Sequence, residues 1–442
     1  MGSLAAPSPN GASLLPASGA PPLSGSCSGP FPDDDRGLFP DEERGLFPDR
    51  ERGLHFIELP TSRAAPRSMT RLLLEQLRVR DLRNLGSVEL TPAARVNVIS
   101  GNNGHGKTSL LEAIYFAATS RSFRTSRVPE LIRHGATVAF AKARFVEMDS
   151  ELPPIAREQS AAIQGKTCTA RIDGNRPATL AEFATRSPVI AFHPEELTLS
   201  TGPAPGRRTL LDRLALFIDP VSADHRARYT RALKARQQLL RRAVGGSLDS
   251  AEIEAFEYLC ARHGAALTRA RADAAGALEL ELLPAFRHIA APDLTLSARF
   301  EPGGSADVAE AAAELRSRRP RDAHRPSAGF GPHRDDLGLY LDDHAARIVA
   351  SQGQHRALTL ALKAAETAAI ARARGLEPIL LLDDVSSELD RDRTEALFTF
   401  LSLTRGQIFL TTTRRELIVT PGLDPSLRRD FHVDAGTLVQ AS

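Results

Sequence analysis

The chain has 442 residues, of which 42% are hydrophobic and 25% are charged, a composition typical of a folded globular protein. The formal net charge of +2 is too small to indicate nucleic-acid binding, so only the distribution of basic residues can do so. The cysteines Cys27, Cys168 and Cys260 lack the spacing of a zinc site or a disulfide framework, which favours a reducing compartment. Because no apolar run approaches transmembrane length and no signal sequence is evident, we expect a cytoplasmic protein without membrane contacts.

Residues 1–68 are rich in Pro, Gly, Ser and Ala and contain three copies of an eight-residue repeat, namely Phe31–Leu38, Phe39–Leu46 and Phe47–Leu54. Each copy reads Phe-Pro, a charged patch and then Arg-Gly-Leu. A repeat this short, with Pro and Gly in every copy, cannot build an element with a buried face, so we expect disorder. A docking tail is the alternative interpretation. The folded part is predicted to begin near Met69, which is also a candidate initiator.

Strands and helices follow from Met69 onward. The first predicted elements are strands at residues 72–79, 87–90, 96–99, 138–145 and 161–172, and a helix at 109–119. Long amphipathic helices are then predicted between residues 207 and 288, including 226–244 and 251–284. Arms of about 35 residues extend roughly 50 Å, which indicates a lobe and not a long coiled coil. The remaining predictions are a basic linker at 316–325, a strand at 338–341, a helix at 355–374 and a strand at 379–382.

The segment from Gly101 to Thr108 fits the phosphate-loop pattern G-x-x-x-x-G-K-[ST] and follows an apolar run. Glycines allow backbone N–H groups to turn inward around the β-phosphate, and Lys107 spreads positive charge over the β- and γ-oxygens. Thr108 is expected to bind Mg²⁺, and Lys107 also to act in catalysis. The residues predicted to bind ATP are Gly101, Asn102, Asn103, Gly104, His105, Gly106, Lys107, Thr108 and Ser109.

Two carboxylates follow the aliphatic run at residues 379–382. Four consecutive aliphatic residues are typical of a fully buried parallel strand that ends at the phosphate edge of a sheet. Asp383 therefore suits the Mg²⁺ shell, directly or through water. Asp384 is interpreted as the catalytic residue that polarises the attacking water, and the shorter aspartate predicts slow turnover. The alternative role for Asp384 is a structural cap on Ser386 or Ser387.

The third motif is Ser351-Gln352-Gly353-Gln354, which precedes a long alanine-rich helix. A serine hydroxyl and free N–H groups at a helix N-terminus can bind an anion. No phosphate of the same subunit would lie there, so we expect Ser351, Gly353 and Gln354 to contact ATP held by a second copy of the chain in an ATP-dependent homodimer. The stretch Ser387–Asp390 is expected to cross the same interface.

Several stretches resemble RecF, a family of bacterial recombination and gap-repair ATPases. The similarity extends over nearly all of residues 69–417. Its most specific stretches are residues 97–125, with Arg-Ser-Phe-Arg-Thr at the end, and residues 192–197, 207–212, 331–336 and 380–385. The N-terminal repeat departs from the family. Thr411-Thr412-Thr413 stands where ABC transporters have a switch histidine.

The motifs and the resemblance predict an α/β fold, an ABC-type P-loop ATPase head formed by N- and C-terminal segments with an inserted helical lobe. The expected domains are the extension 1–68, the N-terminal head 69–206, the helical lobe 207–325 and the C-terminal head 326–442. The resemblance further implies duplex and gapped DNA as partners, action with RecR and RecO to help RecA load at single-strand gaps, and roles in replication, recombinational repair and the SOS response.

The basic residues support DNA binding through the phosphate backbone. Arg121, Arg124 and Arg127 cluster after the first helix, and five further arginines crowd residues 316–325. Neither cluster has aromatic neighbours placed for base stacking. A solvated charged surface is the alternative. Two other classes of protein remain. One is the nucleotide-binding subunit of a transporter, whose ATPase activity membranes and not DNA would stimulate. The other is a scaffold that does not hydrolyse ATP.

Overall fold

The computed structural model describes residues 69–243, 250–289, 294–325, 327–384, 404–418, 420 and 423–440. The octapeptide repeats and the stretch Ser387–Asp390 lie outside these residues. Within the described part of the chain, no helix combines the length and the apolar character that crossing a membrane requires.

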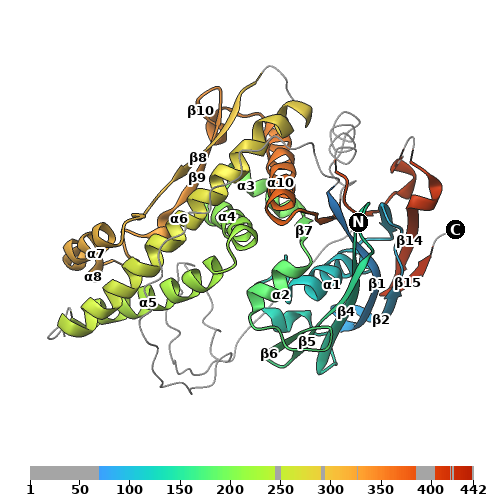
Figure 1. Cartoon of the computed structure of the whole chain (residues 1–442), viewed down its shortest axis with the longest axis horizontal. Helices are drawn as coiled ribbons and strands as arrows, with labels where there is room; N and C mark the ends of the chain where they lie inside the picture. Colours follow the sequence, from blue (N-terminus) through green and yellow to red (C-terminus); the bar gives the residue numbers. More distant parts are fainter. Residues whose placement is uncertain are drawn as a thin grey trace, which may run out of the picture. The chain divides into compact units, whose positions relative to one another are not determined.

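The central sheet has the strand order β15-β14-β3-β13-β12-β7, and every neighbouring pair is parallel except β14 and β15. Figure 1 labels its edge strands β7 and β15. Its strands are β3 (Val96–Ser100), β7 (Val189–Phe192), β12 (Ile379–Leu382), β13 (Ile408–Thr412), β14 (Arg428–Asp434) and β15 (Thr437–Gln440). All residues of β3, β12 and β13 are buried. The prediction of a fully buried parallel strand before Asp383 is therefore confirmed.

A second, largely antiparallel sheet has the order β11-β1-β4-β5-β6, with β2 also paired to β1. Its strands are β1 (Thr70–Leu82), β2 (Leu85–Leu90), β4 (Val138–Met148), β5 (Ile155–Gln164), β6 (Thr167–Ile172) and β11 (Leu376–Glu377). The prediction of one strand at 161–172 was wrong, because the chain reverses at Gly165. Gly165 has a φ of 56°, which favours glycine, and it joins β5 to β6 as a hairpin.

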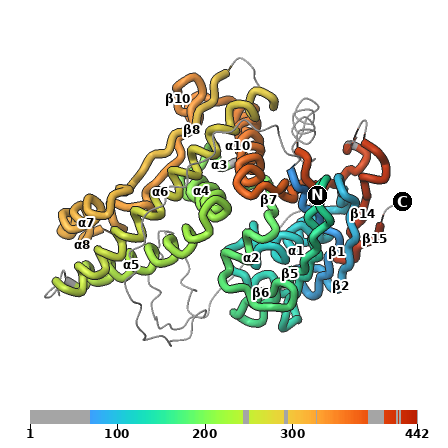
Figure 2. Tube along the Cα trace, in the orientation of Figure 1, coloured from blue at the N-terminus to red at the C-terminus, as the bar shows by residue number. Residues whose placement is uncertain are grey.

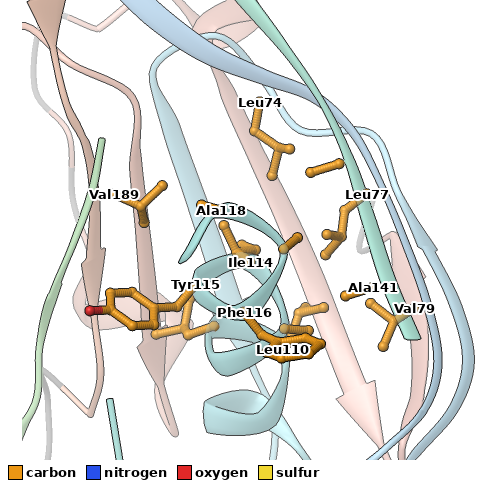
Figure 3. Packing of buried hydrophobic residues seen from close by; sticks show 14 of the residues in the cluster. Leu74, Leu77, Val79, Leu110, Ile114, Tyr115, Phe116, Ala118, Ala141 and Val189 are labelled. Carbon is orange, nitrogen blue, oxygen red and sulfur yellow. The ribbon is translucent and has the colours of Figure 1, made fainter. Parts of the chain in front are cut away.

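Helix α1 (Lys107–Thr119) is enclosed by residues of both sheets. Its side chains Leu110, Ile114 and Phe116 pack into a cluster with Leu74 of β1 and Val189 of β7 (Figure 3). Every residue of α1 except Thr108 is buried. A helix that is buried on all sides is held in position by its surroundings, so the phosphate loop at its start is held as well.

The helices of the middle part pack around α6 (Ser250–Ile289), which contacts α4, α5, α7 and α10. The described helices other than α1 and α6 are α2 (Leu180–Arg186), α3 (Thr198–Thr201), α4 (Ala204–Ile218), α5 (Ser222–Ala243), α7 (Val308–Ser317), α8 (Arg319–Ala323), α9 (Ala346–Val349) and α10 (Gln352–Arg374). Short 3₁₀ turns are η1 (Val128–Leu131), η2 (Pro194–Leu197), η3 (Pro332–Arg334), η4 (Arg415–Leu417) and η5 (Pro425–Leu427). The predicted end of the second long helix at Pro284 was wrong. Phe286 and Ile289 are buried in the core, and this packing carries α6 through the proline.

A small antiparallel sheet, β10-β9-β8, was not anticipated. It consists of β8 (Leu296–Glu301), β9 (Asp336–Leu341) and β10 (His344–Ala345). Because β8 pairs with β9, this sheet joins residues on both sides of the expected domain boundary at residue 325. The domain bounds remain predictions. The predicted linker at 316–325 was also wrong, because these residues include the end of α7 and all of α8.

The two ends of the described chain meet in the central sheet. Strand β3, near the start, lies between β13 and β14, near the end, with Val96 opposite both Ile408 and Arg428. In Figure 2 the blue start and the red end of the coloured tube lie side by side. The strand that leads into the phosphate loop therefore forms only with the C-terminal segment in place.

A buried cluster of four charged side chains joins α10, α4 and η2. The Lys363 ammonium lies 2.9 Å from Glu196 and 2.9 Å from Glu366, and Arg213 pairs with both carboxylates. Burial disfavours the charged form of Glu366, but Arg213 and Lys363 outweigh burial and hold its pKa below the ordinary value. The cluster thus balances two cations with two anions, away from water.

We expect Lys363→Met to lower the free energy of unfolding by about 3 kcal/mol, because two buried carboxylates would share a single cation. Lys142 provides a matched control, since it forms a more exposed pair with Glu158 at 2.7 Å. Lys142→Met should cost less than about 1 kcal/mol. Urea unfolding followed by circular dichroism measures both values, and equal losses would contradict this account of the cluster.

Candidate nucleotide-binding site

The phosphate loop connects β3 to α1 and turns around its own lysine. The Lys107 ammonium donates to the carbonyl oxygens of Gly101 at 2.8 Å and Asn102 at 3.0 Å. Gly104 has a φ of 82° and is exposed, as are Asn102 and Asn103. A Cβ at Gly101, which has a φ of 151°, would lie 2.3 Å from the Val433 carbonyl oxygen, so no other residue fits there.

Lys107 is buried at the base of the loop. Burial lowers its pKa below the ordinary value, and the nearby carboxylates of Asp384 and Asp383 partly oppose this effect. An ammonium held in these surroundings gains strongly from an anion that enters the loop, because little water screens the charge. The lysine is thus placed for the predicted contact with phosphate oxygens.

Two turns brace the loop from outside. The Asn84 amide, in the turn between β1 and β2, donates to the Gly104 carbonyl at 3.0 Å. The turn between β14 and β15 contributes Gly436, whose N–H donates to the His105 carbonyl at 2.9 Å, and Asp434, which lies 2.8 Å from His105 Nδ1. These contacts hold His105 against the hairpin, so its side chain points to Asp434.

Asp383, at the end of β12, accepts two hydroxyl hydrogen bonds on one carboxylate oxygen. Thr108 donates at 2.8 Å and Thr411 donates at 2.8 Å. Burial raises the pKa of Asp383, and the hydroxyl donors oppose that rise. The predicted metal residues Thr108 and Asp383 therefore lie together, although 275 residues separate them in sequence. A hydroxyl and a carboxylate this close are the oxygen ligands that Mg²⁺ prefers.

Asp384 follows with a φ of 51°, a left-handed conformation that Asp tolerates better than most residues. Its N–H donates to Thr411 Oγ1 at 2.7 Å, so one threonine orders both carboxylates. Asp384 is half-buried, and its carboxylate raises the pKa of Lys107 against the effect of burial. The alternative partners Ser386 and Ser387 lie outside the described residues.

The predicted third motif forms the N-terminus of α10, which begins at Gln352 and not at His355. Ser351 Oγ accepts from the Gln354 N–H at 3.2 Å, and the Gln354 side chain accepts from the Ser351 N–H at 2.7 Å. This reciprocal pair is a capping box. Ser351, Gln352 and Gly353 are exposed, so the free N–H groups of the first turn face outward. The structure does not bring this motif to the phosphate loop of its own chain by any contact among the described residues.

The predicted basic clusters are partly neutralised within the chain. Arg124 lies 3.8 Å from the buried carboxylate of Glu112, and Arg127 lies 3.8 Å from Glu130. In the second cluster, Arg318 pairs with Glu314 at 2.5 Å. In the same cluster, Arg319 binds Glu257 through two nitrogens. These residues hold loops and helices together, which weakens the case for them as phosphate contacts.

Sequence reasoning missed the roles of Thr411 and Asn84. Thr411 was noted only because it stands where ABC transporters have a switch histidine. Its position directly after the apolar residues 408–410 of β13 could have identified it as a residue of the site. Ser109 is buried in α1 and Gly106 forms its N-terminal boundary with a φ of 116°. The roles of all these residues stay predictions.

Comparison with known proteins gives consistent matches. The model of the RecF/RecN/SMC N terminal domain family matches residues 73–421. The DNA replication and repair protein RecF of Anaeromyxobacter sp. (strain Fw109-5) is 42% identical over 78% of this chain and 93% of its own length. The protein of the same name from Myxococcus xanthus (strain DK1622) is 37% identical over 80% of this chain and 94% of its own.

Among solved structures, the recombination mediator protein RecF with ATPrS in the RecFOR pathway superposes with a TM-score of 0.75. Its sequence is 24% identical, and the match covers 85% of this chain and all of that one, which supports the fold. A second RecF structure, with ATP, gives a TM-score of 0.74. The family model and the curated relatives each span most of the chain, and the chain belongs to the RecF family of DNA replication and repair proteins.

Proposed function

We propose that this chain is an ATP-driven, DNA-binding protein of replication and recombinational repair. ATP closes a homodimer on duplex DNA at single-strand gaps, where the protein acts with RecO and RecR to help RecA load and contributes to SOS induction. The observation that carries the proposal is the meeting of Thr108, Asp383 and Thr411 beside the phosphate loop. This arrangement of hydroxyl and carboxylate oxygens suits Mg²⁺-ATP.

The residues present fit this nucleotide. Among the described residues no side chain caps the N-terminus of α1, which suits a phosphate there, and Lys107 supplies a buried cation for the β- and γ-phosphates. Thr108 and Asp383 would hold the metal ion. Mg²⁺ would neutralise charge on the phosphate oxygens and so favour attack of water on the γ-phosphorus. The related RecF structures with ATP and ATPrS support the same ligand for this chain.

Hydrolysis then depends on Asp384, which directly follows the proposed metal ligand Asp383. Its carboxylate is proposed to orient the attacking water, and its short side chain favours slow turnover. ATP therefore serves as a timed switch between open monomer and closed dimer. A scaffold without hydrolysis is the alternative, and it would release no phosphate in the presence of Mg²⁺.

Dimer formation depends on the exposed start of α10. Ser351, Gly353 and Gln354 are proposed to contact the γ-phosphate that Lys107 of the second copy holds. The outward-facing first turn supports this role, because such N–H groups bind anions. ATP thereby gains contacts in the closed state that it lacks in the open state, and this differential affinity drives closure.

Phosphate release in the presence of gapped duplex tests the proposal directly. We expect duplex DNA to stimulate turnover and lipid vesicles to leave it unchanged. Stimulation by vesicles alone would favour the transporter alternative. A complete lack of Mg²⁺-dependent phosphate release would favour the scaffold.

Two substitutions should separate nucleotide binding from turnover. Lys107→Ala removes the buried cation, so nucleotide binding measured by fluorescence should fall at least about 100-fold. Asp384→Asn keeps the shape of the side chain and tolerates the same φ, so binding should persist while phosphate release falls about 100-fold. Hydrolysis at the wild-type rate by Asp384→Asn would show that another group positions the water.

Ser351→Arg should block closure without harming the phosphate loop of its own chain. Nucleotide should still bind, whereas ATP-dependent dimerisation, hydrolysis and ATP-stimulated DNA binding should fail together. Sedimentation with ATP measures the dimer. Thr179→Arg is the control, since Thr179 caps α2 through the Glu182 N–H and its loss removes a helix cap elsewhere. An ATP-driven dimer of Ser351→Arg with normal turnover would leave the motif as a helix cap only.

A further inference from the structure

Helix α5 carries a charge imbalance that the nucleotide site does not use. Its only acidic residue is Asp224. Its basic residues are Arg226, Arg228, Arg231, Lys234, Arg236, Arg241 and Arg242. Sequence reasoning assigned this stretch to a helix of the lobe and overlooked its charge, because the balanced total of the chain hides it.

Two of these cations serve the interior of the protein. Arg236 is completely buried and donates to Glu257 of α6 at 3.2 Å and to Asp322 of α8 at 2.8 Å. Arg226 pairs with Asp212 of α4 at 3.2 Å. These contacts attach α5 to its neighbours on one side. They therefore leave the opposite side of α5 exposed to solvent.

The other five cations are all exposed. They are Arg228, Arg231, Lys234, Arg241 and Arg242. At about 100° per residue, Arg228, Arg231 and Arg242 lie within about 60° of one another and form a row, which Lys234 and Arg241 flank on one side. From Arg228 to Arg242 the row extends about 21 Å at 1.5 Å per residue. Arg228 pairs with Asp224 at 2.7 Å, and solvent-exposed pairs of this kind contribute little to stability.

The exposed face of α5 lacks the features of a protein interface. Between the cations it presents Ala227, Thr230 and Gln238, which are small or polar. None of the exposed large hydrophobic side chains in the described part of the chain belongs to α5. A protein partner would need an apolar centre with a polar rim, whereas a sugar-phosphate backbone needs only a row of cations. Arginine, which dominates the row, binds phosphate through two nitrogens.

We infer that the exposed face of α5 binds the phosphate backbone of duplex DNA. The inference rests on the proposed function and assigns a surface to it. A row of about 21 Å follows roughly 6 base pairs, at 3.4 Å between phosphates of one strand. Recognition is independent of sequence, since the face offers cations and no group that reads base edges.

The test replaces both Arg231 and Arg242 by glutamine. Neither arginine forms an ion pair within the described residues. Glutamine favours helix as arginine does, so α5 should keep its fold. The probe is a fluorescently labelled blunt duplex, titrated with ATP present at several salt concentrations. The control variant replaces Arg287 and Arg374, exposed arginines in the last turns of α6 and α10, in the same way.

We expect the Arg231→Gln, Arg242→Gln variant to bind the duplex about 10-fold more weakly and the slope of log K against log salt to fall by about 2, because each lost phosphate contact removes about 0.9. Nucleotide binding and ATP-driven dimerisation should match those of the wild type, and the control variant should keep the full slope. If the variant binds duplex with the affinity and salt slope of the wild type, the inference is overturned. The proposed function would still stand in that case, because the wild type binds DNA. Loss of an acidic protein partner with normal DNA binding would also overturn it. Failure of the wild type itself to bind duplex would overturn both.

Discussion

The rest of the structure depends on one carboxylate oxygen of Asp383, which accepts hydrogen bonds from Thr108 and Thr411. These hydroxyls come from the start of α1 and the end of β13, so the contact closes the central sheet around the phosphate loop. The two sheets that enclose α1 keep Thr108 in place. In the parallel order β3-β13-β12, the strand of Thr411 lies between the strand that leads to Thr108 and the strand that leads to Asp383. Asp383 is thereby oriented before any ligand arrives, which reduces the cost of organising a metal site.

A series of contacts leads from this site to α10, the helix that Ser351 caps. Tyr115 of α1 packs edge-on against Phe123, and Phe123 stacks on His193, with ring centroids 5.6 Å and 5.5 Å apart. Glu196 follows His193 within η2 and pairs with Lys363 of α10. The phosphate-loop helix and the proposed dimer helix are therefore attached to one buried framework. Since packed interiors shift between discrete arrangements, such a framework is suited to coupling nucleotide binding to closure.

Motifs that combine local spacing with strand context could be predicted from the sequence. The loop at Gly101–Thr108, the buried strand before Asp383 and the capped helix after Ser351 all depend on short-range patterns, and all three appear in the structure. Features set by tertiary pairing could not be predicted. Strand β8 forms because it pairs with β9, and α6 continues through Pro284 because Phe286 is buried. Arg318 pairs with an acid on the neighbouring helical turn, and Arg319 pairs with an acid far away in sequence.

The central claim is that a complete site needs two chains, with the loop of one and Ser351 of the other. Mixing the Lys107→Ala chain with the Ser351→Arg chain tests it most directly. In a head-to-tail dimer, one of the two sites would then combine an intact loop with an intact Ser351, and the other would be doubly damaged. The account predicts that phosphate release, absent from each variant alone, appears on mixing. A mixture as inactive as its separate components, with nucleotide bound to the Ser351→Arg chain, would contradict it.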